Sequence, residues 1–377
     1  MPRVKSNKKR PWLKPLIIVL SILFVVVGGV GAYAAYQGYG IYNQLDTLQK
    51  PKEESRFGQF EVKEEEKPVE WEGTERVNIL LMGGDNRGLE KNEAARSDSM
   101  LVASIDPVTK KAHLFSVLRD TYVPIEGHGE GRINTALALG GPNLAMKTIG
   151  GMLGLDIQYY VYTDFEGFKS LIDAIGGIDF DVEKNMNYVD NADGNRYDIH
   201  LKKGFQHLDG EHALMYVRFR HDAMSDFTRT ERQRNFLDTV ADKLKNGWNL
   251  LKMKQILESV NPYIETNLDI SDMLKLAQLG VKTQLAGQAQ VPPMDNIGDR
   301  KVSGASVLSI RDDDELLTYV QEILTEDSAV PDATASGTGN ADGASANTSG
   351  SGNTGSSTNT GNTSSSSNTD SSSKTNE

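Results

Sequence analysis

Hydrophobic residues recur with two different spacings between residues 76 and 330. Short apolar runs typical of buried strands cover residues 77–82, 100–105, 112–118, 158–162 and 178–182. Helical spacing covers residues 142–153, the segment from Asp164 as N-cap to Gly176, and a long stretch after Asp226. Strands mixed with covering helices predict an α/β fold, with a central mixed β-sheet flanked by helices in α-β-α layers.

The lengths of the connections between these segments predict how the strands pair. Only the polar residues 106–111 separate the second and third strands, which predicts an antiparallel hairpin. The strand, helix and strand over residues 158–182 predict a βαβ unit.

A continuous apolar run covers residues 16–36 and carries no charge. About 20 such residues cross a bilayer as a helix. The charged residues before the run are all basic, so the positive-inside rule predicts a cytoplasmic tail at 1–14, one transmembrane helix at 15–36, and an extracellular remainder. The small residues at 32–35 also allow a cleaved signal peptide, which the length of the run disfavours.

Composition separates the rest of the chain into three parts. Residues 37–75 are charged and lack a sustained apolar period, which predicts a solvated extracellular stalk. One catalytic domain is expected over 76–330, with its core over 76–244. Residues 331–377 are almost purely Ser, Thr, Asn and Gly, which predicts a disordered tail.

Charge and residue content exclude several classes of function. The net charge is −12, which argues against general nucleic-acid binding. There are no cysteines, so disulfides, thiolate metal sites and thiol nucleophiles are excluded. The histidines show no HExxH spacing, and no GxSxG elbow or Walker loop is present.

Charged residues gather at the ends of the first three predicted strands. The first strand ends just before Asp85, and the hairpin brings the end of the third strand beside the start of the second. One edge of the sheet should therefore carry Asp85, Arg87, Arg96, Asp98, Arg119 and Asp120.

A second cluster lies downstream. Arg218 and Arg220 are two residues apart, so in extended chain they point to one side. The apolar stripe of the long helix continues toward its N-terminus through Gln233, Arg232 and Arg229. Buried arginines are costly unless an anion pairs with them. Pairing with nearby aspartates, exposure at a helix end, and a bound phosphate are the three explanations, and the number of arginines favours phosphate.

Asp85 and Asp98 beside such a cluster suit a Mg²⁺ ion, because magnesium binds one or two carboxylates together with phosphate oxygens. The alternative is that the two aspartates cap loops or pair with Arg87 and Arg96.

Several motifs occur in the order typical of one family: NILLMGGDNRG, RSDSMLVASID, SVLRDTYV, RINTALALGGP, DFEGFKSLIDAIGGID, LDGEHALMYVRFRHD and DFTRTERQRNF. Over residues 76–244 the chain therefore resembles the LytR-CpsA-Psr proteins. The resemblance implies a cell-wall ligase that transfers a phosphate-linked glycopolymer, such as teichoic acid, from a polyprenyl-pyrophosphate carrier to peptidoglycan.

The resemblance also implies roles for individual residues. The pyrophosphate would be held by Arg96, Arg119, Arg218, Arg220, Arg229 and Gln233. Arg119, Arg218, Arg220 and Asp98 would act in catalysis, and Asp85 and Asp98 would hold Mg²⁺. The prenyl chain would enter between sheet and helices, with Phe165, Phe168 and Leu171 as candidate walls that could equally be ordinary core.

Two other functions use the same residues. One is a polyprenyl-pyrophosphate phosphatase with water as acceptor. The other is a lipid-sensing or regulatory membrane protein without catalysis, for which a DNA-binding role is weakened by the short cytoplasmic tail.

Overall fold

The computed structural model describes residues 36–60, 62, 71–85, 96–189, 194–195, 198–221 and 225–325. Within this part of the chain, no helix is both long enough and apolar enough to cross a bilayer. The segments expected at 1–14 and 331–377 lie outside the described residues, and so does the 15–36 anchor except for Tyr36.

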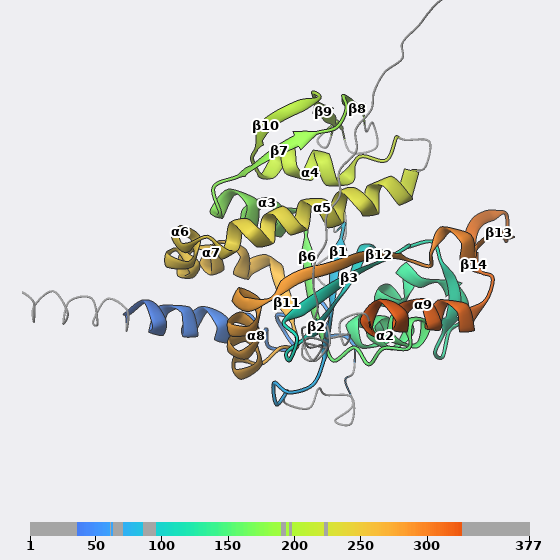
Figure 1. Ribbon diagram of the computed structural model, residues 1–377, viewed down its shortest axis with the longest axis horizontal. Helices are drawn as coiled ribbons and strands as arrows, with labels where there is room; N and C mark the ends of the chain where they lie inside the picture. The colour runs from blue at the N-terminus through green and yellow to red at the C-terminus, as the bar shows by residue number, and fades with distance from the viewer. Residues whose placement is uncertain are drawn as a thin grey trace, which may run out of the picture. The chain divides into compact units, whose positions relative to one another are not determined.

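A six-stranded mixed sheet forms the centre, in the order β11-β6-β1-β2-β3-β12 (Figure 1). Its antiparallel middle consists of β1 (Val77–Gly84), β2 (Ser97–Asp106) and β3 (Lys111–Val117). On one side β6 (Tyr159–Asp164) runs parallel to β1, followed by the antiparallel edge strand β11 (Ile264–Thr266). On the other side β12 (Gln284–Val291) runs parallel to β3. The predicted mixed sheet and the predicted hairpin are therefore confirmed.

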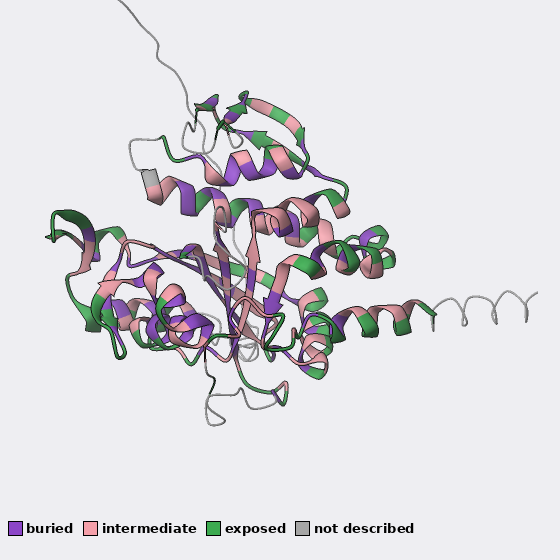
Figure 2. Cartoon of the chain, turned by 180° about the vertical axis from the view of Figure 1, so that it is seen from behind, coloured by how far each residue is buried: buried purple, intermediate pink, exposed green. Residues whose placement is uncertain are grey.

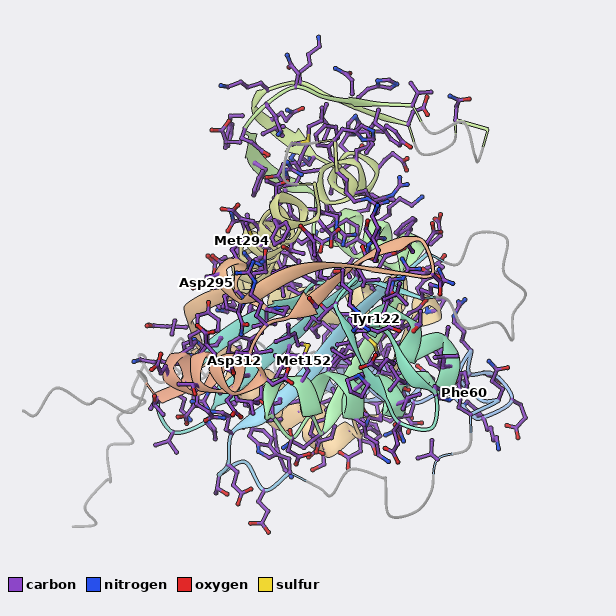
Figure 3. All side chains as sticks on the ribbon, turned by 90° about the vertical axis from the view of Figure 1, so that its right-hand side faces the viewer. Phe60, Tyr122, Met152, Met294, Asp295 and Asp312 are labelled. Atoms are coloured by element: carbon purple, nitrogen blue, oxygen red, sulfur yellow. The ribbon has the colours of Figure 1, made fainter. Side chains whose placement is uncertain are left out.

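One face of the sheet packs against α2 (Ala136–Leu153) and α9 (Asp313–Thr325). Leu80, Val102 and Phe115 point to this face and are fully buried, as the alternation along each strand requires. Figure 3 views the molecule from the side of these helices and labels Phe60 and Met152, which pack against this core. α2 breaks at Gly140 and Gly141 and ends at Gly154, so its regular part begins at Pro142, as predicted.

The opposite face of the sheet packs against α8 (Ile270–Lys282) through Ile79, Tyr159 and Leu279. A second core lies beyond this face, and purple buried stretches mark it in Figure 2. It consists of α3 (Phe165–Ala174), α4 (Gly210–Arg218), α5 (Ser225–Lys245) and α7 (Met253–Val260), with the strands β7 (Ile178–Val182), β8 (Met186–Tyr188), β9 (Ile199–Leu201) and β10 (Gly204–Leu208).

The predicted βαβ unit is wrong in one respect. α3 does begin at its N-cap Asp164, whose side chain accepts a hydrogen bond from the Gly167 amide. The following strand β7, however, pairs with β10 in a separate two-stranded sheet. Gly176 and Gly177 both adopt positive φ and turn the chain away from the central sheet.

Short elements complete the domain. They are the hairpins β4 (Tyr122–Ile125) with β5 (Gly129–Arg132) and β13 (Ile297–Val302) with β14 (Ala305–Ile310), the short helix α6 (Gly247–Leu251), and the 3₁₀ turns η2 (Ile133–Thr135), η4 (Asn261–Tyr263) and η5 (Met294–Asn296).

Folded structure begins before the boundary expected at Arg76. Residues 36–46 are helical, and Leu45, Leu48 and Phe57 are buried. The Phe57 ring meets Tyr162 edge to face at 5.0 Å, and the Ser55 hydroxyl donates to Glu265 at 2.6 Å. The expectation of a solvated stalk is therefore corrected for these residues. Their apolar residues are too few to show a hydrophobic periodicity in the sequence, yet Leu45, Leu48 and Phe57 each pack against the domain.

Candidate active site

The charged centre lies where β1 ends, β2 begins and β3 ends. The register pairs Gly84 with Ser97 and shifts between Gly83 and Gly84, so an irregularity in the ladder falls beside Asp98. Asp85 follows Gly84 directly. Gly84 has to be glycine, because a Cβ there would lie 2.4 Å from the Tyr162 hydroxyl oxygen.

Arg119 follows the end of β3 and is surrounded by carboxylates. Its Nη1 donates to Asp98 Oδ1 at 2.5 Å, and its Nε lies 3.5 Å from Asp120 and 3.8 Å from Asp226. Burial opposes the charge of Arg119, but these carboxylates outweigh it and raise the guanidinium pKa above its ordinary value. The predicted meeting of the ends of β2 and β3 is thus present in the structure.

Arg229 faces the same centre from the first turns of α5. Only 5% of it is exposed, and its Nη2 lies 2.8 Å from Asp226 Oδ1. Burial lowers the pKa of Arg229 to about 10, Asp226 opposes this shift, and the positive charges of Arg119 and Arg220 add to it. The Nε of Arg229 and the Nε of Arg119 are buried and have no hydrogen-bond partner among the described residues. Within this part of the chain, the centre therefore holds buried donors that are not satisfied.

Gln233 ties α5 to the other two parts of the site. Its side-chain oxygen accepts from the Ser99 hydroxyl at 3.0 Å, and its amide donates to the Val217 carbonyl at 3.2 Å. Ser99 is the neighbour of Asp98 on β2, and Val217 precedes Arg218 on α4. One side chain thus links β2, α4 and α5 next to the arginines.

Arg218 and Arg220 leave α4 at its C-terminal end. Arg218 is the last helical residue rather than part of an extended pair, so the expected extended geometry of Arg218 and Arg220 is corrected. The Arg218 guanidinium lies 4.9 Å from the centre of the Phe165 ring. Arg220 is exposed, and its charge reaches Arg229.

Arg96 is exposed just before β2, and no contact of its side chain is described. Asp85 is half-buried. Arg87 lies outside the described residues.

Asp85 and Asp98 are the carboxylates that a Mg²⁺ ion would need at this centre. Among the described residues, no group of three or more His, Asp or Glu side chains converges as a metal site would require. Asp98 is 35% exposed at its side chain, and its Oδ1 is occupied by Arg119. Carboxylates at adjoining strand ends are the type of ligand that Mg²⁺ takes together with phosphate and water.

Phe165, Phe168 and Leu171 are half-buried on α3 and pack against the second core. Across from the α2 and α9 layer, Leu81, Ala103 and Leu114 project from the other face of the sheet and are also only half-buried. Partly covered apolar side chains therefore lie on α3 and on this face of the sheet.

A separate hollow of about 510 Å³ lies between the second half of α5 and β12. Asp238, Asp242 and Lys245 line it together with residues 283–288. It is polar and lies at the opposite end of α5 from Arg229, so it is not the predicted site.

Sequence reasoning missed Asp226 and Ser99. The signal for Asp226 was present, because it lies three residues before Arg229 in the first turn of a helix, where such pairs meet. Nothing in the sequence pairs Ser99 with Gln233, which is 134 positions away.

The fold and site define an α/β protein with arginines and aspartates gathered at the strand ends of a mixed sheet. The chain belongs to the LytR_cpsA_psr family, whose sequence model matches residues 36–317. Bacillus subtilis TagV, named a polyisoprenyl-teichoic acid–peptidoglycan teichoic acid transferase, is 32% identical over 72% of this chain and 68% of its own length. Staphylococcus aureus MsrR, named a regulatory protein, is 34% identical over 59% of this chain and 64% of its own.

A solved relative carries a ligand. The LytR-CPS2A-psr family protein YwtF (TagT) with bound octaprenyl pyrophosphate lipid matches with a TM-score of 0.53 and 25% identity. The match covers 70% of this chain and 95% of that one.

Proposed function

We propose that this protein transfers a phosphate-linked glycopolymer of the teichoic acid type from a polyprenyl-pyrophosphate carrier to peptidoglycan. The observation that carries the proposal is the incompletely satisfied arginine centre. Arg119 follows β3 and is half-buried, Arg229 is buried in α5, and the Nε of each finds no hydrogen-bond partner among the described residues. The transferase name of TagV and the pyrophosphate lipid bound to TagT support the same chemistry.

The reaction needs little covalent help from the protein. A peptidoglycan hydroxyl attacks the phosphorus attached to the glycopolymer, a new phosphodiester bond forms, and polyprenyl phosphate leaves with the electrons of the broken bond. Arg119, Arg229 and Arg220 neutralise the negative charge that builds on the phosphate oxygens in the transition state. Asp98 or Asp120 accepts the hydroxyl proton.

Asp85 and Asp98 would hold Mg²⁺, which supplies additional positive charge at the pyrophosphate when it is bound. Arg119 would shift from Asp98 toward the phosphate when substrate enters, because a dianionic oxygen cluster competes well for a guanidinium.

The prenyl chain would lie between α3 and the sheet, against Phe165, Phe168 and Leu171 on one side and Leu81 and Ala103 on the other. Burial of apolar chain surface contributes about 25 cal/mol per Å². The ring of Phe165 below Arg218 marks the point where apolar wall and phosphate centre meet.

The domain would act outside the cell membrane, held by a single helix at residues 15–36 with the N-terminus in the cytoplasm. The apolar run and the basic residues before it support this topology. The family match from residue 36 onward is compatible with an anchor that ends there.

The proposal is tested with the purified full chain in vesicles, given Mg²⁺, a polyprenyl-pyrophosphate glycan and peptidoglycan oligomers. Mass spectrometry should detect glycan joined to the oligomer through phosphate. Arg119→Ala should abolish the product, and Arg76→Ala serves as the matched control, because Arg76 is as exposed as Arg119 and pairs with Asp106 at the opposite end of β2 from Asp98. Omitting Mg²⁺ tests the metal separately.

Release of free phosphorylated glycan without conjugate would instead establish a phosphatase. Lipid binding without any turnover would refute the transferase and favour a regulatory role of the kind that the name of MsrR describes.

A further inference from the structure

Large apolar side chains are exposed around the N-terminal end of the described chain. Trp248 is 65% exposed, Leu251 is 63% exposed and Tyr39 is 69% exposed. Isolated exposed apolar residues are ordinary, but a group of them with aromatic members marks a contact surface. We call the set Tyr36, Tyr39, Trp248, Leu250 and Leu251 the aromatic rim.

The two halves of the aromatic rim are in contact although they are far apart in sequence. The Gln37 side-chain amide donates to the Leu251 carbonyl at 3.3 Å. The Lys254 ammonium lies 5.2 Å from the centre of the Tyr36 ring. Figure 1 shows α6 and α7 beside the helix that residues 36–46 form. The rim is therefore one surface made by residues 36–46 and α6.

Lysines accompany the aromatic side chains. The Lys252 ammonium lies 5.1 Å from the centre of the Trp248 ring, and Lys254 lies next to Tyr36 and pairs with Glu258 at 3.4 Å. Aromatic rings with a polar end and lysines with an apolar stem prefer the headgroup region of a bilayer. The chemistry of the rim is thus that of a membrane interface with anionic lipid.

The position of the rim along the chain agrees with this chemistry. Tyr36 is the last residue of the apolar run over residues 16–36. The rim consequently begins at the residue where the chain would leave the bilayer.

The rim is also joined to the active centre by packed helices. α6 leads directly into α7, and Ile256 of α7 is buried in the same core as α3. α3 begins with Phe165, whose ring lies under Arg218. A fixed orientation of the rim would therefore fix the orientation of the arginine centre.

We propose that the aromatic rim docks onto the anionic headgroup surface of the bilayer and holds the domain in one orientation above it. This proposal rests on the anchor at residues 15–36 given under the proposed function. A domain held in this way presents its arginines at a constant height, which suits a substrate whose pyrophosphate is itself attached to a lipid.

Tryptophan fluorescence tests the proposal, because the chain has only three tryptophans, at 12, 71 and 248. Trp71 is 9% exposed and donates to the Glu75 carbonyl, so it serves as the internal reference. The full chain with Trp12→Phe is reconstituted into phosphatidylglycerol–phosphatidylcholine vesicles that contain lipids brominated near the headgroup. The same chain with Trp248→Phe as well gives the Trp71 signal alone.

Subtraction should show Trp248 emission reduced by roughly half, because a ring in the interface lies beside the bromines, and Trp71 emission unchanged. Reducing the phosphatidylglycerol content should weaken the quenching. Unquenched Trp248 in protein that floats with the vesicles would overturn the docking proposal and leave the anchor intact. Protein that does not float with vesicles would overturn the anchor and the docking proposal together.

A functional readout separates docking from a merely structural role. Leu251→Ser with Trp248→Ser should raise the KM for a long-chain substrate in vesicles roughly tenfold. The KM for a short-chain, water-soluble substrate should not change. An equal rise for both substrates, or none for either, would contradict docking.

Discussion

Arg229 and Arg232 lie one turn apart on α5 and are each 5% exposed, yet their surroundings differ completely. Arg232 donates from Nε to Glu183 at 2.6 Å and from Nη1 to the Phe219 carbonyl at 2.8 Å. Arg229 has Asp226 at 2.8 Å and shares that carboxylate with Arg119, and its Nε has no hydrogen-bond partner in the part of the chain that the structure describes.

The difference shows how one helix carries a structural and a functional arginine. Arg232 is enclosed by groups that satisfy its charge, so it joins α5 to the second core. Arg229 is buried against other cations, and its lowered pKa shows the cost of that position. Arg229 shares Asp226 with Arg119 at the strand ends, and phosphate is the ligand whose shape and charge match two guanidinium groups in that position.

The largest expected effect comes from Arg229→Met. Turnover should fall about 100- to 1,000-fold, because one buried donor to the transferred phosphate is lost. The free energy of unfolding should stay within about 1 kcal/mol of the parent, since an incompletely paired buried charge is removed. Single-turnover conjugate assays and urea unfolding measure the two quantities. A stability loss as large as the activity loss would place Arg229 with the structural arginines.

Arg232→Met should reverse this pattern. It leaves the Phe219 carbonyl and Glu183 without their donor, which should cost about 2–3 kcal/mol of unfolding free energy. Turnover per folded molecule, measured at a temperature well below unfolding, should change less than about threefold. Full stability with lost activity would contradict the assignment.

A third buried arginine of α5, Arg234, extends the comparison between Arg229 and Arg232. It is 8% exposed, and its Nε and Nη1 are buried without a hydrogen-bond partner. Burial lowers its pKa, and Glu231 opposes the shift. Arg234→Met should therefore raise the free energy of unfolding by about 1 kcal/mol and leave turnover unchanged. A clear loss of activity would show that Arg234 also faces the substrate.

The smallest expected effect is that acid reduces the stabilisation that the Arg232–Glu183 pair contributes. Burial raises the pKa of Glu183, but hydrogen bonds from Arg232 and Tyr216 outweigh it and hold the pKa below 4.5. This stabilisation is present above pH 4.5 and is lost as the pH falls through the folded-state pKa. The stability gap between the parent and Arg232→Met should consequently narrow below that pH in urea titrations. A constant gap would show that Glu183 contributes nothing.

The sequence predicted the central hairpin and most of the long helices correctly, because alternation and helical spacing are local properties. It also placed Asp98 and Arg119 at one sheet edge, since a hairpin with a short connection allows no other geometry. Prediction failed where partners are distant. The predicted βαβ unit required β7 to join the central sheet after α3, and the structure pairs β7 with β10 instead.

Membership in the family, the mixed sheet and the arginine positions could thus be predicted by sequence alone, because they depend on ordered motifs and on periods along the chain. Only the tertiary structure decided which arginine is satisfied and which is not. Glu183 and Phe219 come from segments outside α5, and packing alone sets their distances to Arg232. The burial of Phe57 against Tyr162 is of the same kind, since a single aromatic residue has no period to reveal where it packs.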